Sequence, residues 1–302
     1  MEEPADPHWN LGPAVWFSVF VFAAFILALL GAALAAYIVS SYGAALEAEE
    51  NACWMRGRLG AWALEAMLRC GKLMGSAAHD ARMRDAALAR ASVLAAEPPQ
   101  PGGVCFVGSS TFTYWKSLTK DMSEALQLGA PPRCPDVRCW NAAFGGSCAP
   151  QQLAHIDALC TKWRPSVVLW FCGTNDINFD FYGTTPDTAL DAFAAWLQVL
   201  RAACPATTVV YLAATVTPFV VARGAATVAR FEAHNRAARA FAETHVGVYF
   251  VKSAPWQRGE PQLYMGDAHH LTRTGHVQLA RLLAPAVRRA LEHGTQLAGL
   301  AG

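Results

Sequence analysis

The sequence predicts an α/β protein: a three-layer α/β/α sandwich with a five-stranded parallel sheet, preceded by an N-terminal transmembrane helix and a helical neck. The sheet is predicted by short apolar runs that alternate with helix-length amphipathic segments after residue 103. The transmembrane helix is predicted by a long apolar stretch near the N-terminus. The composition agrees, because only 16% of the residues are charged, against roughly 25% in an average soluble domain.

Five short apolar runs are the predicted strands. They cover residues 104–107, 137–140, 167–171, 208–213 and 246–251. The amphipathic segments between and after them cover residues 151–163, 187–203, 222–244 and 272–293. Helix-length connections pair strands in parallel, with helices on both faces. In such sheets sites form at the carboxyl ends of the strands, so the residues that follow each run are the candidates for a functional site.

Residues 14–42 are the predicted transmembrane helix. No Asp, Glu, Lys or Arg occurs from Trp9 to Leu46, and about 20 apolar residues cross a bilayer as a helix. A cleaved signal peptide is the alternative, but the acidic leader and the long apolar run favour a retained, single-pass span. Arg56 and Arg58 follow the span while no Lys or Arg precedes it. This weakly favours a C-terminal domain on the cytoplasmic-equivalent side of an unidentified membrane.

The rest of the chain divides at a proline-rich break. Residues 1–13 are a tail, 43–97 are Ala-rich without proline and predict a helical neck, and 98–103 are a linker. One α/β domain then covers residues 104–293, and 294–302 form a C-terminal tail. Apolar residues recur in the neck at spacings of three and four, which predicts a helix packed on the α/β domain. A protein partner bound through residues 44–97, or the membrane surface, is the alternative.

Charge and cysteine patterns argue against two kinds of site. The net charge is +1 and the basic residues are scattered, so no nucleic-acid partner is expected. None of the nine cysteines has the spacing of a zinc site. Cys105 and Cys172 lie within apolar runs, and we expect mostly reduced, buried thiols. Cys134 and Cys139 are the candidate pair for a disulfide if the domain faces an oxidising compartment.

Two turns predict a nucleophile and an acid–base pair. The first strand ends in Gly108-Ser109-Ser110, where a hydroxyl at the start of a helix would lie beside free backbone N–H groups. Asp267 precedes His270 by three residues, so the carboxylate could hold one ring nitrogen while the other faces a nucleophile. Taken alone, a serine at this place is more often a plain helix N-cap, and the Asp and His are compatible with a surface pair.

Two more turns follow the second and third strands. Gly145 and Gly146 follow the second, and paired glycines let a backbone approach a ligand closely. Asn175 follows the third, where its side chain could aim N–H groups into the crevice. Alone, the glycines favour an ordinary turn, whereas Asn175 is equally compatible with a turn residue or a helix cap. Together, the four turns follow strands of one sheet and supply a nucleophile, oxyanion donors and an acid–base pair.

This combination resembles the SGNH (GDSL-like) hydrolase superfamily, in its bacterial-type branch with a Gly-Ser-Ser first block, over about residues 103 to 293. The superfamily's four blocks are a Gly-Asp-Ser-like turn, a Gly, a Gly-x-Asn-Asp turn and an Asp-x-x-His pair. The resemblance implies an SGNH/flavodoxin-like sandwich and a serine-dependent carboxylic ester hydrolase. Ser109 stands where the founding motif has Asp, though the branch that this chain resembles also carries Ser there.

Residue by residue, the resemblance implies a catalytic triad. Ser110 would be the nucleophile, His270 the general base and later the acid, and Asp267 the residue that orients His270. His269 is an alternative base, but the three-residue spacing from Asp267 favours His270. The adjacent histidines also suggest a metal site, yet no further ligand stands at a usual spacing, so neither a metal nor a cofactor is expected.

The resemblance also implies an oxyanion hole. Its donors would be the backbone N–H groups of Ser110 and Gly146 and the side chain of Asn175. The sequence thus predicts a membrane-anchored serine ester hydrolase that acts on an acyl or O-acetyl ester through an acyl-enzyme intermediate. A small-molecule, lipid or carbohydrate ester would be the substrate. The alternative is a non-catalytic structural or accessory subunit of a membrane complex that retains the fold, which the long neck would suit.

Overall fold

The computed structural model describes most of the chain after the predicted membrane segment. The described residues are 21, 58–128, 137–178, 184–253 and 261–300. The predicted transmembrane helix at 14–42 therefore lies outside them, except for Val21. Within the described residues, no helix has the length and apolar character needed to cross a membrane.

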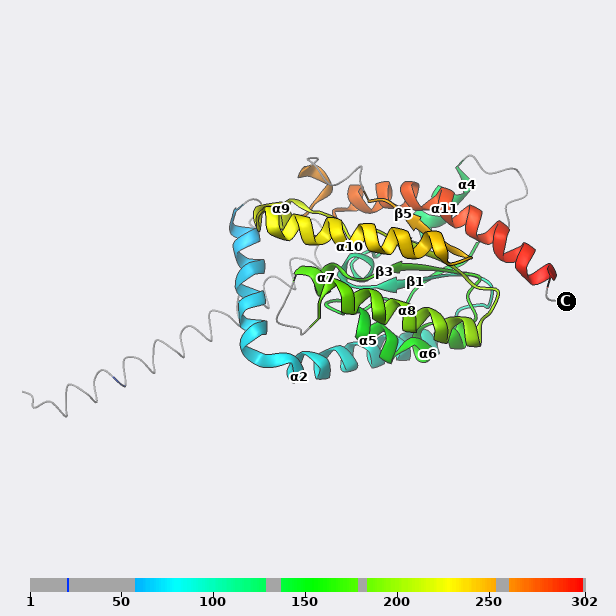
Figure 1. The fold of residues 1–302 in the computed structure, drawn as a ribbon, viewed down its shortest axis with the longest axis horizontal. Coiled ribbons are helices and arrows are strands. Elements are labelled where there is room, and N and C mark those ends of the chain that lie inside the picture. Colours follow the sequence, from blue (N-terminus) through cyan, green and yellow to red (C-terminus); the bar gives the residue numbers. More distant parts are fainter. Residues whose placement is uncertain (1–20, 22–57, 129–136, 179–183, 254–260, 301–302) are drawn as a thin grey trace, which may run out of the picture.

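A five-stranded parallel sheet forms the centre of the molecule, in the order β2-β1-β3-β4-β5 (Figure 1). The strands are β1 Val104–Gly108, β2 Cys139–Asn141, β3 Val167–Phe171, β4 Thr208–Leu212 and β5 Val248–Val251. The predicted parallel α/β sheet is confirmed, and each strand starts or ends within about two residues of its predicted run, the usual boundary uncertainty. Every residue of β1, β3 and β4 is buried, which is why these runs are apolar throughout rather than alternating.

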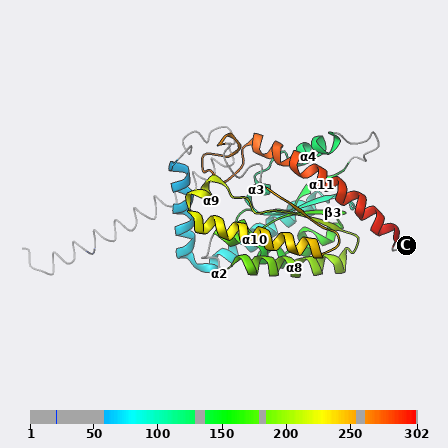
Figure 2. The same ribbon diagram turned by 45° about the horizontal axis from the view of Figure 1, so that its top comes forward.

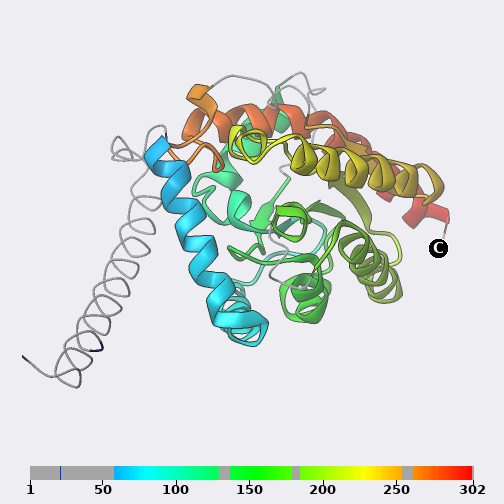
Figure 3. The same ribbon diagram turned by 60° about the vertical axis from the view of Figure 1, so that its left-hand side comes forward.

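Helices cover both faces of the sheet (Figures 1 and 3). They are α2 Arg58–Ala96, α3 Ser110–Thr113, α4 Leu118–Gln127, α5 Ala149–Ala154, α6 Ile156–Leu159, η2 Thr161–Trp163, α7 Thr174–Asn178, α8 Pro186–Ala203, α9 Pro218–Ala222, α10 Ala225–Thr244, η5 Pro261–Leu263 and α11 Arg273–Leu300. α3, α4 and α11 contribute to the core on one face, and α2, α6, α8 and α10 to the core on the other. The predicted three-layer sandwich is therefore observed.

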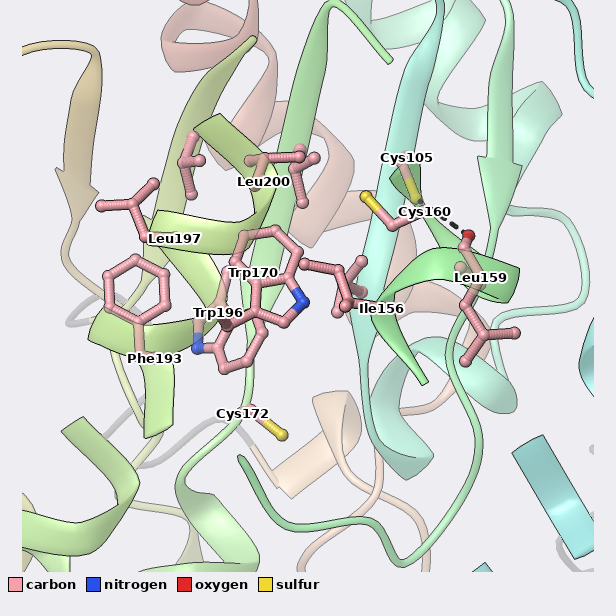
Figure 4. Close-up of a cluster of buried hydrophobic side chains, with 14 of the residues drawn as sticks. Cys105, Ile156, Leu159, Cys160, Trp170, Cys172, Phe193, Trp196, Leu197 and Leu200 are labelled. Carbon is pink, nitrogen blue, oxygen red and sulfur yellow. Dashed lines mark hydrogen bonds between the residues drawn. The ribbon is translucent and has the colours of Figure 1, made fainter. Parts of the chain in front are cut away.

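The larger core lies between the sheet and α8 (Figure 4). The ring of Trp170 on β3 packs on Trp196 and Phe193 of α8, with centroid distances of 4.8 and 5.1 Å. Buried cysteines fill the gaps around these rings, and Cys105 and Cys160 face each other in Figure 4. Free thiols are observed at Cys105, Cys148, Cys160, Cys172 and Cys204. Cys134 lies outside the described residues, so its pairing with Cys139 stays a prediction.

Three helical segments differ from the sequence expectation. The predicted helix 151–163 is divided into α5, α6 and η2, and we find no local sequence feature that marks these breaks. The predicted helix 222–244 starts at Ala225 because Gly224, with φ of 99°, separates it from α9. α11 continues to Leu300, into the range predicted as a tail.

The described part of the predicted neck is one long helix, α2, which is bent (Figures 1 and 2). Met83, Ala87 and Leu94 in its second half are buried in the core that also holds α6 and α8. This half of the helix therefore packs on the α/β domain. α2 therefore contributes to the fold that positions the candidate site.

Candidate active site

The first turn of the site joins β1 to α3 and begins with a required glycine. A Cβ on Gly108 would lie 2.6 Å from the carbonyl oxygen of Phe171 on β3, so a side chain would force the two strands apart. The turn sets Ser110 at the first position of α3. Its backbone N–H makes no hydrogen bond within the described part of the chain, as expected at a helix start. A free donor therefore lies beside the Ser110 hydroxyl.

The second turn, just before α11, carries the acid–base pair. Ala268 takes a left-handed conformation with φ of 58°. The chain folds back so that the backbone N–H groups of His269 and His270 donate to Asp267 Oδ1, at 2.9 and 3.0 Å. Asp267 Oδ2 lies 2.6 Å from His270 Nδ1, and the carboxylate is fully buried. The turn thus fixes both the carboxylate and the orientation of the His270 ring.

Ser110 and His270 meet across the site although they are far apart in the chain. Ser110 Oγ lies 2.9 Å from His270 Nε2. Because Nδ1 faces a carboxylate and carries a proton toward it, Nε2 of the neutral ring is the acceptor for the Ser110 hydroxyl. The structure thus places the Ser110 hydroxyl, the His270 ring and the Asp267 carboxylate in one hydrogen-bonded series.

His269, the alternative base, faces away from Ser110. Its Nδ1 lies 3.1 Å from Thr217 Oγ1, and its ring packs edge-on against Phe219 of α9. Burial, together with the neighbouring His270, lowers the pKa of His269 to about 3. His269 is therefore a neutral, buried side chain, and of the two histidines it is His270 that contacts Ser110.

The three residues predicted as oxyanion donors lie at the ends of neighbouring strands. Gly146 follows β2 with φ of 83°, and Asn175 is in α7 after β3. The Gly146 N–H donates to Ser109 Oγ at 3.1 Å, and Asn175 Nδ2 donates to the same oxygen at 2.7 Å. Both groups therefore lie beside the nucleophile turn. Their common acceptor is Ser109, a contact that the sequence does not predict.

A buried network that the sequence analysis missed supports the nucleophile turn. Asp121 on α4 accepts hydrogen bonds from Trp115 Nε1 at 2.7 Å and Ser117 Oγ at 2.8 Å, and it pairs with Arg273 at the start of α11. Burial raises the pKa of Asp121, but these partners outweigh it and hold the pKa below its ordinary value. The network ties α4 to the start of α11, three residues after His270.

A second missed contact links α11 to the nucleophile turn directly. His276 Nε2 lies 3.1 Å from the carbonyl oxygen of Thr111, the residue after Ser110. The His276 ring stacks on Trp115 with a centroid distance of 5.3 Å and an interplanar angle of 9°. Burial lowers the pKa of His276 to about 4, so the ring is neutral near pH 7 and its Nε2–H can donate to the carbonyl.

The loops behind the site are held by two buried polar side chains. Gln152 Nε2 donates to the carbonyl oxygen of Gly108 at 2.7 Å and to Ser147 Oγ at 2.8 Å. Both carboxylate oxygens of Asp176 accept the N–H of Ala149, at 3.1 and 3.2 Å, and burial raises the Asp176 pKa to about 7. These bonds join the β1, β2 and β3 loops into one unit.

α2 also reaches the site, which its place in the sequence does not reveal. A Cβ added to Gly146 would meet Met83 Cε at 3.4 Å and Arg82 Nη2 at 3.6 Å. Arg90 Nε donates to the carbonyl oxygen of Ala143 at 3.2 Å, in the same loop after β2. The second half of α2 therefore covers the loop that carries Gly146. In the part of the chain that the structure describes, no cluster of three His, Cys, Asp or Glu side chains could hold a metal ion.

Comparison with known proteins agrees with this geometry. The sequence profile of the GDSL-like lipase/acylhydrolase family matches residues 106–278, which is more than half of the chain. The chain belongs to this family. The predicted SGNH (GDSL-like) relationship is thereby confirmed, and the protein is an ester-hydrolysing enzyme. The matched range contains all four turns of the site. The assignment to a Gly-Ser-Ser branch stays a prediction.

Solved structures share the fold of this family member at low sequence identity. A GDSL-like lipase from Bacteroides thetaiotaomicron is 18% identical with a TM-score of 0.52, and the match covers 66% of this chain and 98% of that one. A lipase/acylhydrolase from Enterococcus faecalis is 13% identical with a TM-score of 0.52, covering 62% of this chain and 95% of that one. No curated protein matches the sequence. At these identities the likeness concerns the fold alone.

Proposed function

We propose that the protein is a serine ester hydrolase in which Ser110, His270 and Asp267 form the catalytic triad and an acyl or O-acetyl ester is the substrate. The single observation that carries the proposal is the continuous hydrogen-bonded series from Ser110 Oγ to His270 Nε2, at 2.9 Å, and from His270 Nδ1 to Asp267 Oδ2, at 2.6 Å. Buried titratable groups in this order match the requirements of nucleophilic acyl transfer.

The proposed reaction has two halves. Ser110 Oγ attacks the ester carbonyl carbon while His270 Nε2 takes the hydroxyl proton, and Asp267 stabilises the imidazolium that results. The Ser110 N–H, the Gly146 N–H and Asn175 Nδ2 donate hydrogen bonds that stabilise the developing oxyanion. His270 then protonates the leaving alcohol, which leaves an acyl group on Ser110. Water, deprotonated by His270, attacks the acyl carbon and releases the carboxylic acid and free Ser110.

A fluorophosphonate probe tests the proposal, because it reacts covalently only with an activated serine. We expect labelling of the wild-type protein and none of Ser110→Ala, with both proteins equally folded by circular dichroism. Absence of labelling in folded wild-type protein would contradict the triad and would favour the alternative, a non-catalytic accessory subunit. Membership of an ester-hydrolase family disfavours that alternative.

We further propose that residues 14–42 anchor the enzyme in a membrane, on the strength of their uncharged apolar sequence. The full chain should then stay in the membrane pellet after carbonate extraction, and deletion of residues 1–43 should release it. Wild-type protein in the soluble fraction, or a mature N-terminus near Ala36, would contradict the anchor.

A further inference from the structure

Asp176 is a buried carboxylate without a positively charged partner. It follows Asn175 in α7 and is fully buried. Both of its oxygens accept the Ala149 N–H, at 3.1 and 3.2 Å. Among the described residues, no Lys, Arg or charged His lies beside it to offset the negative charge. A carboxylate that is buried without a cation costs folding free energy, so stabilisation of the fold does not account for this side chain.

The groups that face Asp176 are neutral. They come from four elements and are Cys148 before α5, Cys172 after β3, Tyr211 on β4 and His234 on α10. Burial raises the pKa of the two thiols and of the phenol above their ordinary values, and it lowers the pKa of His234. Asp187 on α8 interacts with His234. Burial also raises the pKa of Asp176 to about 7, so Asp176 changes charge near neutral pH while these neighbours stay neutral.

Asn175 and Asp176 are adjacent, and together they bind the loop after β2 at two points. Asn175 Nδ2 donates to the carbonyl oxygen of Ser147 at 2.8 Å, and Asp176 accepts the N–H of Ala149, two residues further on. Gly146 directly precedes Ser147. The two proposed donors, the Gly146 N–H and Asn175 Nδ2, converge on one hydroxyl oxygen of the nucleophile turn, at 3.1 and 2.7 Å. The relative position of the two donors therefore depends on both contacts to the loop.

We propose that ionised Asp176 is a positioning residue for the oxyanion hole: by holding the Ala149 N–H, it keeps the Gly146 N–H aligned with Asn175 Nδ2. A protonated carboxyl group accepts more weakly than a carboxylate, and its own proton needs an acceptor. Protonation therefore loosens the loop, and a misplacement of about 1 Å near a catalytic group can cost about 100-fold in rate. The assignment rests on the proposed function, since it requires an oxyanion to form at Ser110.

Asp176→Asn, which has the shape of the protonated acid, tests the assignment at pH 8. On a p-nitrophenyl ester, kcat should fall about 10- to 100-fold while KM stays within about threefold, because the donors act on the transition state. The urea midpoint should stay the same or rise, because the variant removes a charge that is buried without a cation. The affinity for a methyl trifluoromethyl ketone, which forms an oxyanion on Ser110, should fall by the same factor as kcat. Asp191→Asn, at an exposed position of α8, is the matched control and should leave all four quantities unchanged.

The pH dependence of the wild type supplies a readout that a structural role would not change. His270 has to lose a proton to act as the base, and Asp176 has to lose one to hold Ala149. A plot of log kcat/KM should therefore fall toward acid pH with a slope of about two, over the range in which circular dichroism shows folded protein. In Asp176→Asn only His270 still titrates, so the slope should be about one.

Three results would overturn the assignment. A wild-type slope of about one would show that protonation of Asp176 does not affect catalysis, and this measurement decides the question even if Asp176→Asn does not fold. A rise in KM with kcat unchanged would make Asp176 a determinant of ground-state binding. A lowered urea midpoint with full kcat in the folded fraction would make its role structural.

Fluorophosphonate labelling separates failure of this assignment from failure of the proposed function. Asp176→Asn should still be labelled at Ser110, more slowly than the wild type, and Ser110→Ala should not be labelled. Labelling of Asp176→Asn at the wild-type rate would count against the positioning role alone. Labelling that persists in Ser110→Ala would instead overturn the triad.

Discussion

The nucleophile turn and the acid–base turn each carry two adjacent residues of one kind, and the fold treats the two pairs differently. Ser109 and Ser110 both face the site, one toward the oxyanion donors and the other toward His270. Of the two histidines, only His270 faces the site, whereas His269 is turned to Thr217. Neighbouring residues in these turns therefore have different contacts because their side chains point in different directions. The sequence motifs identify one member of each pair, Ser110 and His270, and do not predict the contacts of the other member.

The largest expected effect separates the two histidines. His270→Ala should reduce kcat/KM by at least about a thousandfold, because it removes the ring nitrogen that contacts the Ser110 hydroxyl and would take its proton. His269→Gln should stay within about tenfold of wild type, because Gln can keep a hydrogen bond to Thr217. Steady-state kinetics on one ester measures both. A more severe loss in His269→Gln than in His270→Ala would contradict the assignment of His270 as the general base.

The next effect concerns what holds the nucleophile turn. Asp121→Asn should lower the free energy of unfolding by about 1–3 kcal/mol, since it weakens the buried bonds from Trp115, Ser117 and Arg273. Urea unfolding measures the change. The control is Lys120→Ala, which removes an exposed ion pair with Glu124 and should cost under about 1 kcal/mol. Equal effects in the two variants would show that the Asp121 network does not stabilise the fold.

The pH dependence of stability tests whether His269 is neutral in the folded protein. Its folded-state pKa is about 3 against an ordinary value of 6.5. Between those values the unfolded chain binds a proton that the folded protein does not, so stability is lost as the pH falls below 6.5. His269→Gln should reduce the slope of the unfolding free energy against pH by up to about 1.4 kcal/mol per pH unit, which corresponds to one proton. Urea unfolding of wild type and variant from pH 7 to pH 4.5 gives the slopes, and parallel curves would contradict a buried neutral His269.

The smallest effect tests the backbone of the acid–base turn. Ala268 has φ of 58°, which glycine adopts without strain and which a β-branched residue strongly resists. Ala268→Gly should change the unfolding free energy by less than about 1 kcal/mol, because relief of strain offsets the lost chain restriction. Ala268→Val should cost more than about 1 kcal/mol. If thermal unfolding showed that the two variants lose the same amount of stability, the left-handed conformation would not determine which residues are tolerated at position 268.

Much of the fold follows from the sequence because its elements are strongly patterned. β1, β3 and β4 are mostly continuous apolar runs, because a strand buried on both faces consists mainly of apolar residues. α8 has a Thr185 cap and Pro186 at its first turn, which are local signals for its start. The Asp267–His270 pair of the proposed triad can also be predicted from the sequence, because a carboxylate three residues before a histidine is a local relation. Its contact with Ser110 then follows from the shared sheet edge.

What the sequence could not give depends on contacts between distant segments. α4 is an amphipathic helix that the sequence analysis did not predict. Asp121 acquires its role only because Arg273 and Trp115 lie beside it in the folded protein. The approach of α2 to Gly146 depends on how that helix docks. Ser109 is the sharpest case, because nothing in Gly-Ser-Ser states that one hydroxyl faces Asn175 rather than capping α3. A polar residue beside a predicted nucleophile was the one available signal.

The proposed triad is tested most directly by locating the acyl group on the enzyme. A reaction with a slowly deacylated p-nitrophenyl ester is quenched in acid after the initial burst, digested, and fragmented in a mass spectrometer so that Ser109 and Ser110 are resolved. We predict one acyl group, on Ser110, in wild type and in Ser109→Ala, and none in Ser110→Ala or His270→Ala. An acyl group on Ser109, or hydrolysis at an unchanged rate in Ser110→Ala, would contradict the proposed triad.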